Sequence, residues 1–280
     1  MNTDVVAIIV SYNSNLTRLA ETLTVISQQC RVVVVDNSTS EDIIEALKNI
    51  CFSMRISIIP LRGNYGIAYA QNKGIEWANE NKASDILLMD DDSLPSKNLV
   101  SDLLAARSRY LDPVVVSALA IDEDGSEINA KNNKFNEEPC TELMSSGTLI
   151  PISIIEVVGN FDERLFIDCV DYEWGWRAIS KGYSLYISRD ALIRHCLGEG
   201  KQMRMRMPSP IRHYYQYRNV LEMIVSSKAP MRWRASQSVK LPLKLLLIAL
   251  FADRRTERLK YAFKGIGDFL NSRFGKIQVL

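Results

Sequence analysis

The sequence predicts an α/β fold with a mostly parallel central sheet flanked by helices and a helical appendage at the C-terminus. Two observations predict it. Through residues 1–110, short runs rich in β-branched residues alternate with helix-like segments. These runs are apolar throughout rather than at every second position, which is typical of parallel strands covered by helices on both faces.

The strand and helix segments alternate regularly in this first part of the chain. Strand-like runs occupy residues 5–10, 31–35, 56–61 and 85–89, and helix-like segments occupy residues 16–28, 40–50, 66–79 and 99–110. The second helix has acidic residues in its first turn, which suits the positive end of a helix dipole.

The pattern changes after residue 110 and again after residue 225. Residues 114–120 are strand-like, residues 122–139 are polar and turn-rich, and residues 171–181 predict a helix in which Glu173 and Arg177 pair at i, i+4. We expect one domain over residues 1–225, with halves at 1–110 and 111–225. A basic amphipathic helical region over residues 226–280 completes the chain.

The bulk composition narrows the class of protein. The 280 residues are 47% hydrophobic, enough for a sizeable core, and the net charge of +1 gives no global attraction to nucleic acid. The five cysteines are odd in number and without a CxxC pair, which argues against a disulfide framework and a zinc site. No secretory signal is readable at the N-terminus. We therefore expect a reduced, cytoplasmic setting and no nucleic-acid partner.

Polar residues follow three of the predicted strands. Tyr12 and Asn13 follow the first strand, Asp36 and Asn37 the second, and three aspartates at residues 90–92 the fourth. Ligands of an open parallel sheet bind beyond the carboxyl ends of its strands, where such loops converge. The loops therefore outline one site, although Asp-Asn-Ser after the second strand is also ordinary turn and helix-capping chemistry.

The aspartate triplet predicts a metal site. Three adjacent carboxylates repel one another, and a divalent cation is the simplest compensating charge. Mg²⁺ or Mn²⁺ held by Asp90 and Asp92 would suit a diphosphate ligand. The alternative is a solvated acidic loop that caps the next helix through Ser93 or Ser96. The first loop contains no glycine-rich phosphate cradle, which argues against a dehydrogenase, a P-loop enzyme and a nucleotidyltransferase.

Several motifs together resemble a known family. Four of them occur in order: Ala7-Ile-Ile-Val-Ser-Tyr-Asn13, Val33-Val-Val-Asp-Asn-Ser38, Gly63-Asn-Tyr-Gly-Ile-Ala68 and Leu87-Leu-Met-Asp-Asp-Asp-Ser93. They resemble the inverting glycosyltransferases of family two, which have a GT-A fold with a Rossmann-like sheet. Ser146-Gly147 and the segment from Phe166 to Ala178 extend the resemblance. The motifs His195-Cys-Leu-Gly198, Tyr214-Tyr-Gln-Tyr-Arg-Asn219 and Gly265-Ile-Gly-Asp-Phe-Leu270 are similar to bacterial rhamnosyltransferases that use dTDP-L-rhamnose.

The resemblance implies a nucleotide-binding half before residue 110, an acceptor half after it, and roles for individual residues. The implied donor-binding residues are Tyr12, Asn13, Asp36, Asn64, Gly66, Asn72, Asp90 and Asp91, with Asp36 reaching the base. The implied ligands of Mg²⁺ or Mn²⁺ are Asp90, Asp92 and His195, although a lone histidine is more often structural.

The catalytic and acceptor-binding residues are implied in the same way. Asp171 falls where the family has its catalytic base, and Gly147, Asp168 and Trp174 fall where the acceptor binds. Val170 precedes Asp171 where an acidic residue is more frequent, so Asp168 and Glu173 remain rival bases. Trp174 and Trp176 are separated by one glycine, so one helix face cannot present both to an acceptor sugar.

The implied reaction is a single inverting displacement. L-rhamnose would pass from dTDP-L-rhamnose to a lipid-linked glycan acceptor of a cell-surface polysaccharide such as O-antigen. A galactofuranosyl- or other hexosyltransferase that uses a UDP-sugar is an alternative, because motifs around a metal do not read the sugar. A non-catalytic nucleotide-sugar binder is another, and it would keep Asp36 and the triplet without needing Asp171.

The C-terminal region has two interpretations. Residues 241–252 are apolar but too few to span a membrane, and they include Lys244. Basic residues interleave with apolar ones at helix-like spacing, which suits peripheral attachment to the anionic inner face of the cell membrane. Alternatively, amphipathic helices pack on the catalytic domain or on a second subunit, which would make a homodimer.

Overall fold

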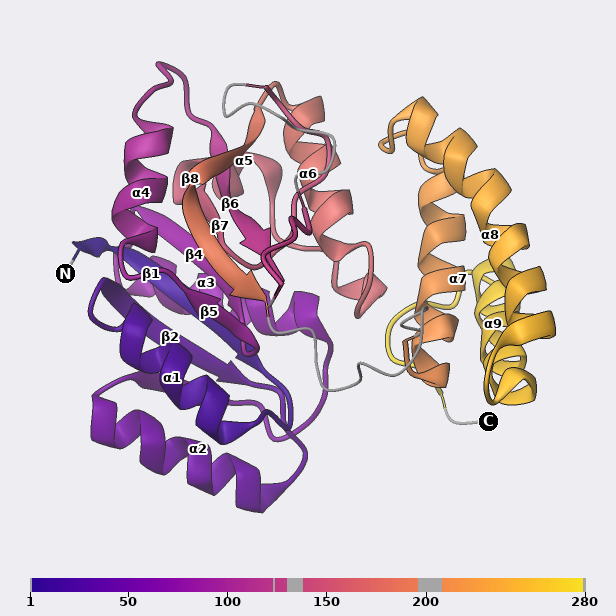
Figure 1. Ribbon diagram of the computed structural model, residues 1–280, viewed down its shortest axis with the longest axis horizontal. Coiled ribbons are helices and arrows are strands. Elements are labelled where there is room, and N and C mark those ends of the chain that lie inside the picture. Colours follow the sequence, from indigo (N-terminus) through magenta and orange to yellow (C-terminus); the bar gives the residue numbers. More distant parts are fainter. Residues whose placement is uncertain (1, 123, 130–137, 196–207, 279–280) are drawn as a thin grey trace.

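The structure, a computed structural model, describes residues 2–122, 124–129, 138–195 and 208–278 (Figure 1). The described residues form one sheet of eight strands in the order β3-β2-β1-β4-β7-β6-β8-β5. The strands are β1 (Asn2–Ser11), β2 (Cys30–Asp36), β3 (Ser57–Pro60), β4 (Asp85–Asp90), β5 (Ser93–Pro95), β6 (Val115–Ile121), β7 (Thr148–Pro151) and β8 (Leu185–His195).

The first half of the sheet is parallel. β1 lies between β2 and β4 and runs parallel to both, and β3 runs parallel to β2. Residues 5–9 of β1 are fully buried, as expected for a strand covered on both faces. In the second half, β7 is antiparallel to β4 and β6, β8 is parallel to β6, and the short β5 is antiparallel to β8. The predicted fold class is confirmed.

Helices cover both faces of the sheet. α1 (Leu16–Ile26), α2 (Glu41–Met54) and α4 (Leu99–Arg107) bury their apolar side chains on one face. α3 (Ile67–Glu80), α5 (Ile152–Val158) and α6 (Val170–Ser180) do so on the other, and a short 3-10 helix, η1 (Glu163–Leu165), precedes α6. α2 continues past its predicted end at residue 50 until Arg55 adopts a left-handed conformation, with φ of 55°.

Three C-terminal helices pack together beside the sheet domain (Figure 1). They are α7 (Pro210–Val225), α8 (Met231–Phe251) and α9 (Arg255–Leu270). α8 reaches the domain through Trp233, whose ring meets that of Trp176 on α6 at a centroid distance of 4.8 Å. α7, which the predicted division at residue 225 assigns to the catalytic domain, contacts α8 and α9 as well as the segment before α6. The division itself stays a prediction.

Two further expectations concern the chain after residue 195. No helix among residues 2–122, 124–129, 138–195 and 208–278 combines the length and apolar character needed to cross a bilayer. The motif that begins at His195 continues through residues 196–198, which lie outside the described residues. Residues 199–207, before α7, lie outside them as well.

α7 and α9 approach each other closely at Gly265. A Cβ atom added there would lie 2.3 Å from the backbone oxygen of Tyr214, a contact that no side-chain movement relieves. We expect Gly265→Ala to lower the free energy of unfolding by about 1–3 kcal/mol, because the two helices must separate. Chemical denaturation measures the change.

Gly267 provides the matched control, because it lies in the same helix and an added Cβ meets nothing within 4 Å. Gly267→Ala should leave stability unchanged or raise it by up to about 1 kcal/mol, since alanine favours a helix. Equal stability of the two variants would contradict the close packing of α7 on α9.

Candidate active site

One cleft collects most of the predicted site residues. Its volume is about 710 Å³, and it lies between residues at the carboxyl ends of β1 and β4 and side chains of α7 and α8. Nine predicted residues line it: Tyr12, Asn64, Gly66, Asp90, Asp91, Asp92, Asp168, Asp171 and His195. Polar loops after parallel strands therefore meet at one place, as the sequence indicates.

Asn13 and Asp36 lie outside this lining but in the adjacent loops. The Asn13 N–H donates to Ser38 Oγ at 2.8 Å, and the Ser38 hydroxyl donates to Asp36 Oδ1 at 2.6 Å. Asp36 is fully buried, and its Oδ2 has no hydrogen-bond partner among the described residues. A buried acceptor without a donor is costly, so this oxygen can still accept a hydrogen bond from a ligand.

Asn72, Gly147 and Trp174 also lie outside the cleft lining. The Asn72 amide exchanges two hydrogen bonds with the backbone of Phe161, at 2.9 and 3.0 Å. Gly147 adopts φ of 79° in the turn before β7. Trp174 is 3% exposed and donates from Nε1 to the Gly159 carbonyl at 2.9 Å. The contacts of Asn72 and Trp174 stabilise the protein itself. The ligand contacts expected of the three residues stay predictions.

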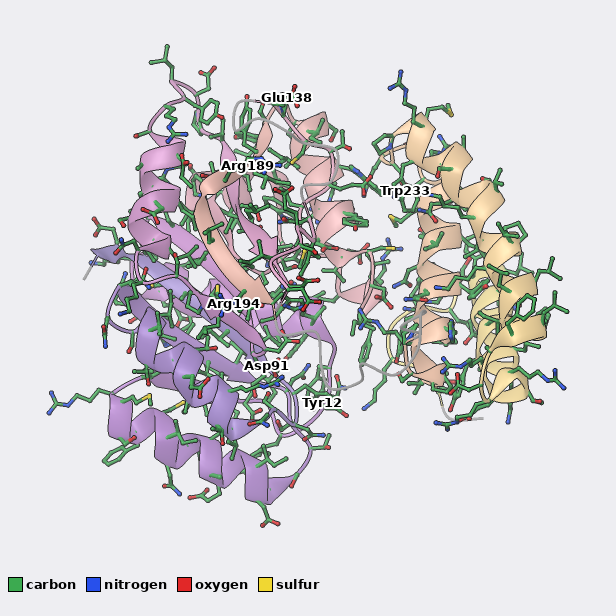
Figure 2. All side chains as sticks on the ribbon, viewed as in Figure 1. Tyr12, Asp91, Glu138, Arg189, Arg194 and Trp233 are labelled. Carbon is green, nitrogen blue, oxygen red and sulfur yellow. The ribbon has the colours of Figure 1, made fainter. Side chains whose placement is uncertain are left out.

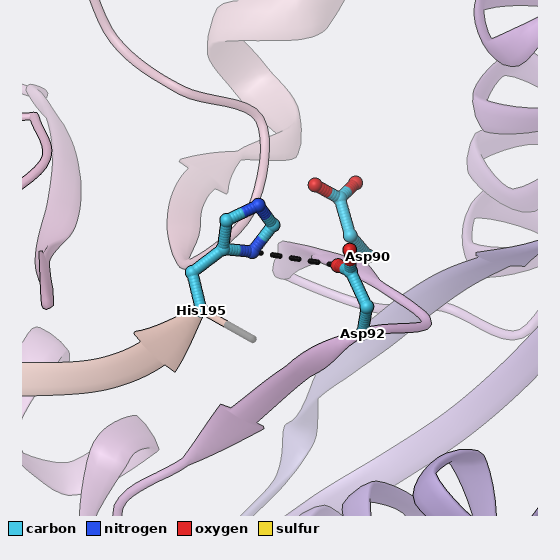
Figure 3. Close-up of side chains that lie close together, drawn as sticks. All are labelled: Asp90, Asp92 and His195. Atoms are coloured by element: carbon cyan, nitrogen blue, oxygen red, sulfur yellow. Dashed lines mark ion pairs between the residues drawn. The ribbon is translucent and has the colours of Figure 1, made fainter. Parts of the chain in front are cut away.

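Asp90, Asp92 and His195 converge on one space (Figure 3). Each offers one ligand atom, and these atoms all lie within 4.8 Å of one another. The antiparallel pairing of Ser93 with His195 brings the end of β8 beside the triplet. His195 Nδ1 lies 2.9 Å from Ser93 Oγ and 3.4 Å from Asp92 Oδ1.

This cluster fits a divalent metal ion. Asp92 Oδ1 is buried and has no hydrogen-bond partner among the described residues, so its lone pairs are available. Two carboxylates and one imidazole are a donor set that Mg²⁺ or Mn²⁺ accepts, and such ions often complete their coordination with substrate phosphates.

The charge of the triplet is poorly compensated by the protein. The pKa of Asp90 is raised to about 7, because burial and the neighbouring carboxylates of Asp92, Asp91 and Asp171 raise it more than Arg212 lowers it. A bound cation would reverse this shift and keep Asp90 ionised at neutral pH.

Asp91 is directed at the first loop. Its Oδ2 accepts hydrogen bonds from the backbone N–H of Tyr12, at 3.2 Å, and from the Ser14 hydroxyl. Figure 2 shows Tyr12 and Asp91 close together at the ends of the parallel strands. Burial raises the pKa of Asp91, while these two donors lower it. Asp91 therefore ties the loop after β1 to the triplet.

The three candidate bases have different partners. Asp168 forms a two-oxygen ion pair with Arg212, with Nη2 to Oδ1 at 2.8 Å and Nε to Oδ2 at 3.2 Å. Glu173 is buried between Arg177 and Lys228, both within 2.9 Å. Asp171, in contrast, forms no ion pair with a Lys or Arg side chain among the described residues. A carboxylate held by a cation is a weak base, so the geometry favours Asp171.

Asp171 occupies the first turn of α6 on the cleft. Its pKa is raised to about 6. Burial is the main cause and the Asp168 charge adds to it, while the backbone N–H groups of Tyr172 and of Asp171 itself act in the opposite direction. The Tyr172 N–H donates to Oδ1 at 3.0 Å, and a backbone N–H of Ser145 also lowers the pKa of the group. A carboxyl group with a pKa near 6 is a suitable general base at neutral pH.

The segment before α6 is strained and is held by α7. Phe166, Asp168 and Cys169 all have positive φ, between 64° and 66°, which costs free energy for residues with side chains. Asn219 Nδ2 lies within 2.9 Å of three carbonyl oxygens in this segment, those of residues 165, 167 and 168. Arg218 Nη2 donates to the first of them at 3.0 Å. Both side chains are fully buried, so α7 fixes the conformation that presents Asp168 and Asp171.

Other residues of the cleft were given no role by the sequence. They include Asn37, Phe166, Tyr172, Arg212, Gln216, Trp233, Lys240 and Lys244. Asn37 holds the loop before α3, because its side chain donates to the Gly66 carbonyl at 3.1 Å and accepts from the Tyr65 N–H at 2.9 Å. Its place after a strand was a usable signal. Gln216 lies within the motif from Tyr214 to Asn219 that carries part of the family resemblance. Trp233, Lys240 and Lys244 of α8 had only basic and apolar interleaving as a signal, which does not place them at a site.

More than half of the chain, residues 6–156, matches the family described as Glycosyl transferase family 2. The chain belongs to this family. It is also 33% identical over 253 residues to dTDP-rhamnosyl transferase RfbF of Shigella flexneri, with 82% of this chain and 83% of that protein covered. The protein is therefore a glycosyltransferase, and the resemblance drawn from its motifs is confirmed.

Solved structures of low sequence identity share its fold. TarS residues 1–349 of S. aureus, in complex with UDP-GlcNAc, has a TM-score of 0.61 at 14% identity, over 97% of this chain and 82% of that one. The mannosyltransferase PcManGT of Pyrobaculum calidifontis, in complex with GDP-Man and Mn2+, has a TM-score of 0.60 at 15% identity, over 98% and 88%. The fold is that of the GT-A glycosyltransferases.

The contacts of Asn219 lead to a prediction. Asn219→Ala should remove the donor shared by three carbonyl groups and let the strained segment relax. We expect sugar transfer to fall by about tenfold to a hundredfold, because the candidate base Asp171 and the neighbouring Asp168 would shift, with a smaller change in nucleotide affinity. Steady-state kinetics and nucleotide titration separate the two.

Asn271→Ala is the control, since Asn271 is exposed and bonds only within its own helix end, to the Gly267 carbonyl at 2.7 Å. It should leave both quantities unchanged. If the Asn219→Ala variant transfers sugar at the wild-type rate, α7 does not position the segment before α6.

Proposed function

We propose that the protein transfers L-rhamnose from dTDP-L-rhamnose to a glycan acceptor by a single inverting displacement. The observation that carries this proposal is the placement of Asp171, a carboxylate without a cationic partner among the described residues, in the same cleft as Asp90, Asp92 and His195. The likeness to the dTDP-rhamnosyl transferase of Shigella flexneri supports the choice of donor.

The donor would bind along the carboxyl ends of β1, β2 and β4. Asp36 Oδ2, buried and without a partner among the described residues, is suited to accept an N–H of the base. Tyr12, Asn64 and Gly66 line the adjoining part of the cleft. Mg²⁺ or Mn²⁺ held by Asp90, Asp92 and His195 would neutralise charge that builds on the departing diphosphate.

The acceptor would enter from the side of α6, α7 and α8. Asp171 accepts the proton of the attacking hydroxyl, and Arg212 holds the Asp168 carboxylate in place. Tyr172 and Trp233 line the cleft and offer the apolar surface expected of Trp174, which lies in the core. One displacement with one base inverts the anomeric carbon.

A membrane-bound acceptor would explain the surface of α8. Its outer side chains Val239, Leu243, Leu246, Leu250 and Phe251 are each more than half exposed. Residues 226–280 contain twelve Lys and Arg residues against three Asp and Glu residues, a net charge of +9, whereas the rest of the chain has −8. Apolar side chains framed by cations suit the anionic cytoplasmic leaflet, so we propose peripheral attachment there, next to a lipid-linked acceptor.

The role of Asp171 is tested by kinetics. Asp171→Asn should lower transfer by about 10³-fold while donor affinity stays within about twofold, because the amide cannot accept the proton. In the wild type, only ionised Asp171 is active and its pKa is raised to about 6. Below that pH, kcat/KM should fall about tenfold per pH unit.

Asp168→Asn is the matched comparison, because this carboxylate is paired with Arg212. It should retain more activity than Asp171→Asn and keep the same pH profile. A larger loss with Asp168→Asn would make Asp168 the base, and unchanged transfer in both variants would exclude the mechanism.

The choice of donor is tested by ligand-induced stabilisation. Thermal unfolding is recorded with thymidine, uridine and guanosine diphosphates, each with Mn²⁺ and with EDTA. We expect the largest rise in midpoint with thymidine diphosphate plus metal, because only binding to the folded state raises it. A larger rise with uridine diphosphate would favour a hexosyltransferase that uses a UDP-sugar, and metal-independent binding would contradict the assigned ligands.

Membrane attachment is tested by co-sedimentation with phosphatidylglycerol vesicles. Leu246→Ser combined with Leu250→Ser should weaken binding at least about tenfold, because two exposed leucines lose contact with the bilayer. Leu111→Ser, at a fully exposed leucine of the sheet domain, is the control and should bind as the wild type does. If the paired change instead dissociates a dimer in sedimentation velocity without affecting vesicle binding, the α8 surface is a subunit interface.

A further inference from the structure

The cleft has walls of opposite charge. Asp90, Asp92 and Asp171 lie on the side of the sheet and α6. Arg212 of α7 and Lys240 and Lys244 of α8 line the other side. The proposed mechanism uses Arg212 through its pair with Asp168 but gives the two lysines no part.

The two lysines share one face of α8. They are four residues apart, so they lie one turn from each other, and Leu241 and Trp233 line the cleft on the same side of the helix. The apolar residues Val239, Leu243 and Leu246 are exposed instead. α8 therefore presents cations and apolar side chains together to the cleft.

Neither lysine is neutralised by the described part of the protein. Lys244 Nζ donates to Gln216 Oε1 at 2.6 Å, a neutral partner. Burial lowers the pKa of Lys244, Asp168 raises it, and Arg212 lowers it. Among the described residues, no carboxylate lies within ion-pair distance of Lys240 or Lys244, whereas Arg212 has one in Asp168. Lys240 is exposed and Lys244 is half-buried. A partly buried ammonium group without a counter-charge is unfavourable, so an anion from the ligand would stabilise Lys244, with Lys240 adding a second charge one turn away.

These cations come from other elements than the metal cluster does. Arg212 of α7 is bonded to Asp168 at 2.8 Å, and Gln216, one turn further along α7, accepts from Lys244 of α8. Lys240 acts on a different carboxyl group, lowering the pKa of Glu142, which burial raises. The lysines thus lie on α8, which meets α6 through the rings of Trp233 and Trp176, on the side assigned to the acceptor.

We propose that Lys240 and Lys244 form a subsite for a phosphate group carried by the acceptor, an inference that rests on the proposed function. The lysines bind the phosphate as point charges, and Gln216 orients Lys244. Trp233 and Leu241 contact the apolar part of the acceptor next to the phosphate. The phosphate belongs either to a lipid carrier or to a soluble sugar phosphate.

The test uses the full-length protein saturated with thymidine diphosphate and Mg²⁺, so that the donor side of the cleft is occupied. Hexyl phosphate and glucose 1-phosphate are titrated calorimetrically into the wild type, into Lys240→Gln combined with Lys244→Gln, and into Lys260→Gln. Lys260 is an exposed cation of α9 outside the cleft lining and serves as the matched control. Glutamine keeps a long polar side chain, and thermal unfolding verifies that each variant folds.

We expect at least one phosphate to bind the wild type and the control equally, and to bind the double variant at least about tenfold more weakly. Tighter binding of hexyl phosphate points to a lipid phosphate, and tighter binding of glucose 1-phosphate to a soluble sugar phosphate. Thymidine diphosphate should bind all three proteins alike.

Two results would overturn the subsite. One is equal phosphate affinity, or none, in the wild type and the double variant. The other is a tenfold loss of thymidine diphosphate affinity in the double variant, which would assign the lysines to the donor. Absence of thymidine diphosphate binding in the wild type counts against the proposed donor instead, and titrations without that nucleotide still report on the subsite.

Discussion

Carboxylates gathered at the end of β4 repel one another, and the rest of the site is arranged around that repulsion. Burial and the charges of Asp92, Asp91 and Asp171 raise the pKa of Asp90 to about 7, so the protein alone does not keep this group ionised at neutral pH. Arg212 is the cation that lowers it, and Arg212 is already paired with Asp168. A divalent ion at Asp90, Asp92 and His195, together with a diphosphate, would supply the missing balance of charge.

The scaffold keeps these groups in place from several directions. The pairing of β5 with β8 delivers His195 to the triplet, and Asp91 fastens the loop after β1 to it. From the other side, Asn219 and Arg218 hold the left-handed residues that precede Asp171. The C-terminal helices thus help to form the proposed active site, since α7 holds the segment that precedes Asp171, the proposed base, and Trp233 and two lysines of α8 line the cleft.

The sequence predicts the parallel half of the fold and its strand-end residues well, because apolar β-branched runs followed by polar loops leave little choice of topology. Asp90, Asp92 and Asp36 were found that way, whereas Asp171 and His195 needed the family resemblance. Contacts between distant segments were not predictable. The sequence cannot show that Asn72 bonds to Phe161, nor that Trp174 and Trp176 are both buried in the core while Trp233 lines the cleft. Those depend on how α6 to α8 fold over the sheet.

The most direct test of this account is a crystal structure of the protein with thymidine diphosphate and Mn²⁺, with the ion located by its anomalous scattering. We expect one Mn²⁺ bound by Asp92 and His195, with Asp90 beside it and both phosphates of the nucleotide bridged to the metal. An ion bound elsewhere, or a diphosphate held without metal while the triplet faces solvent, would contradict the claim that the cleft is built around a cation.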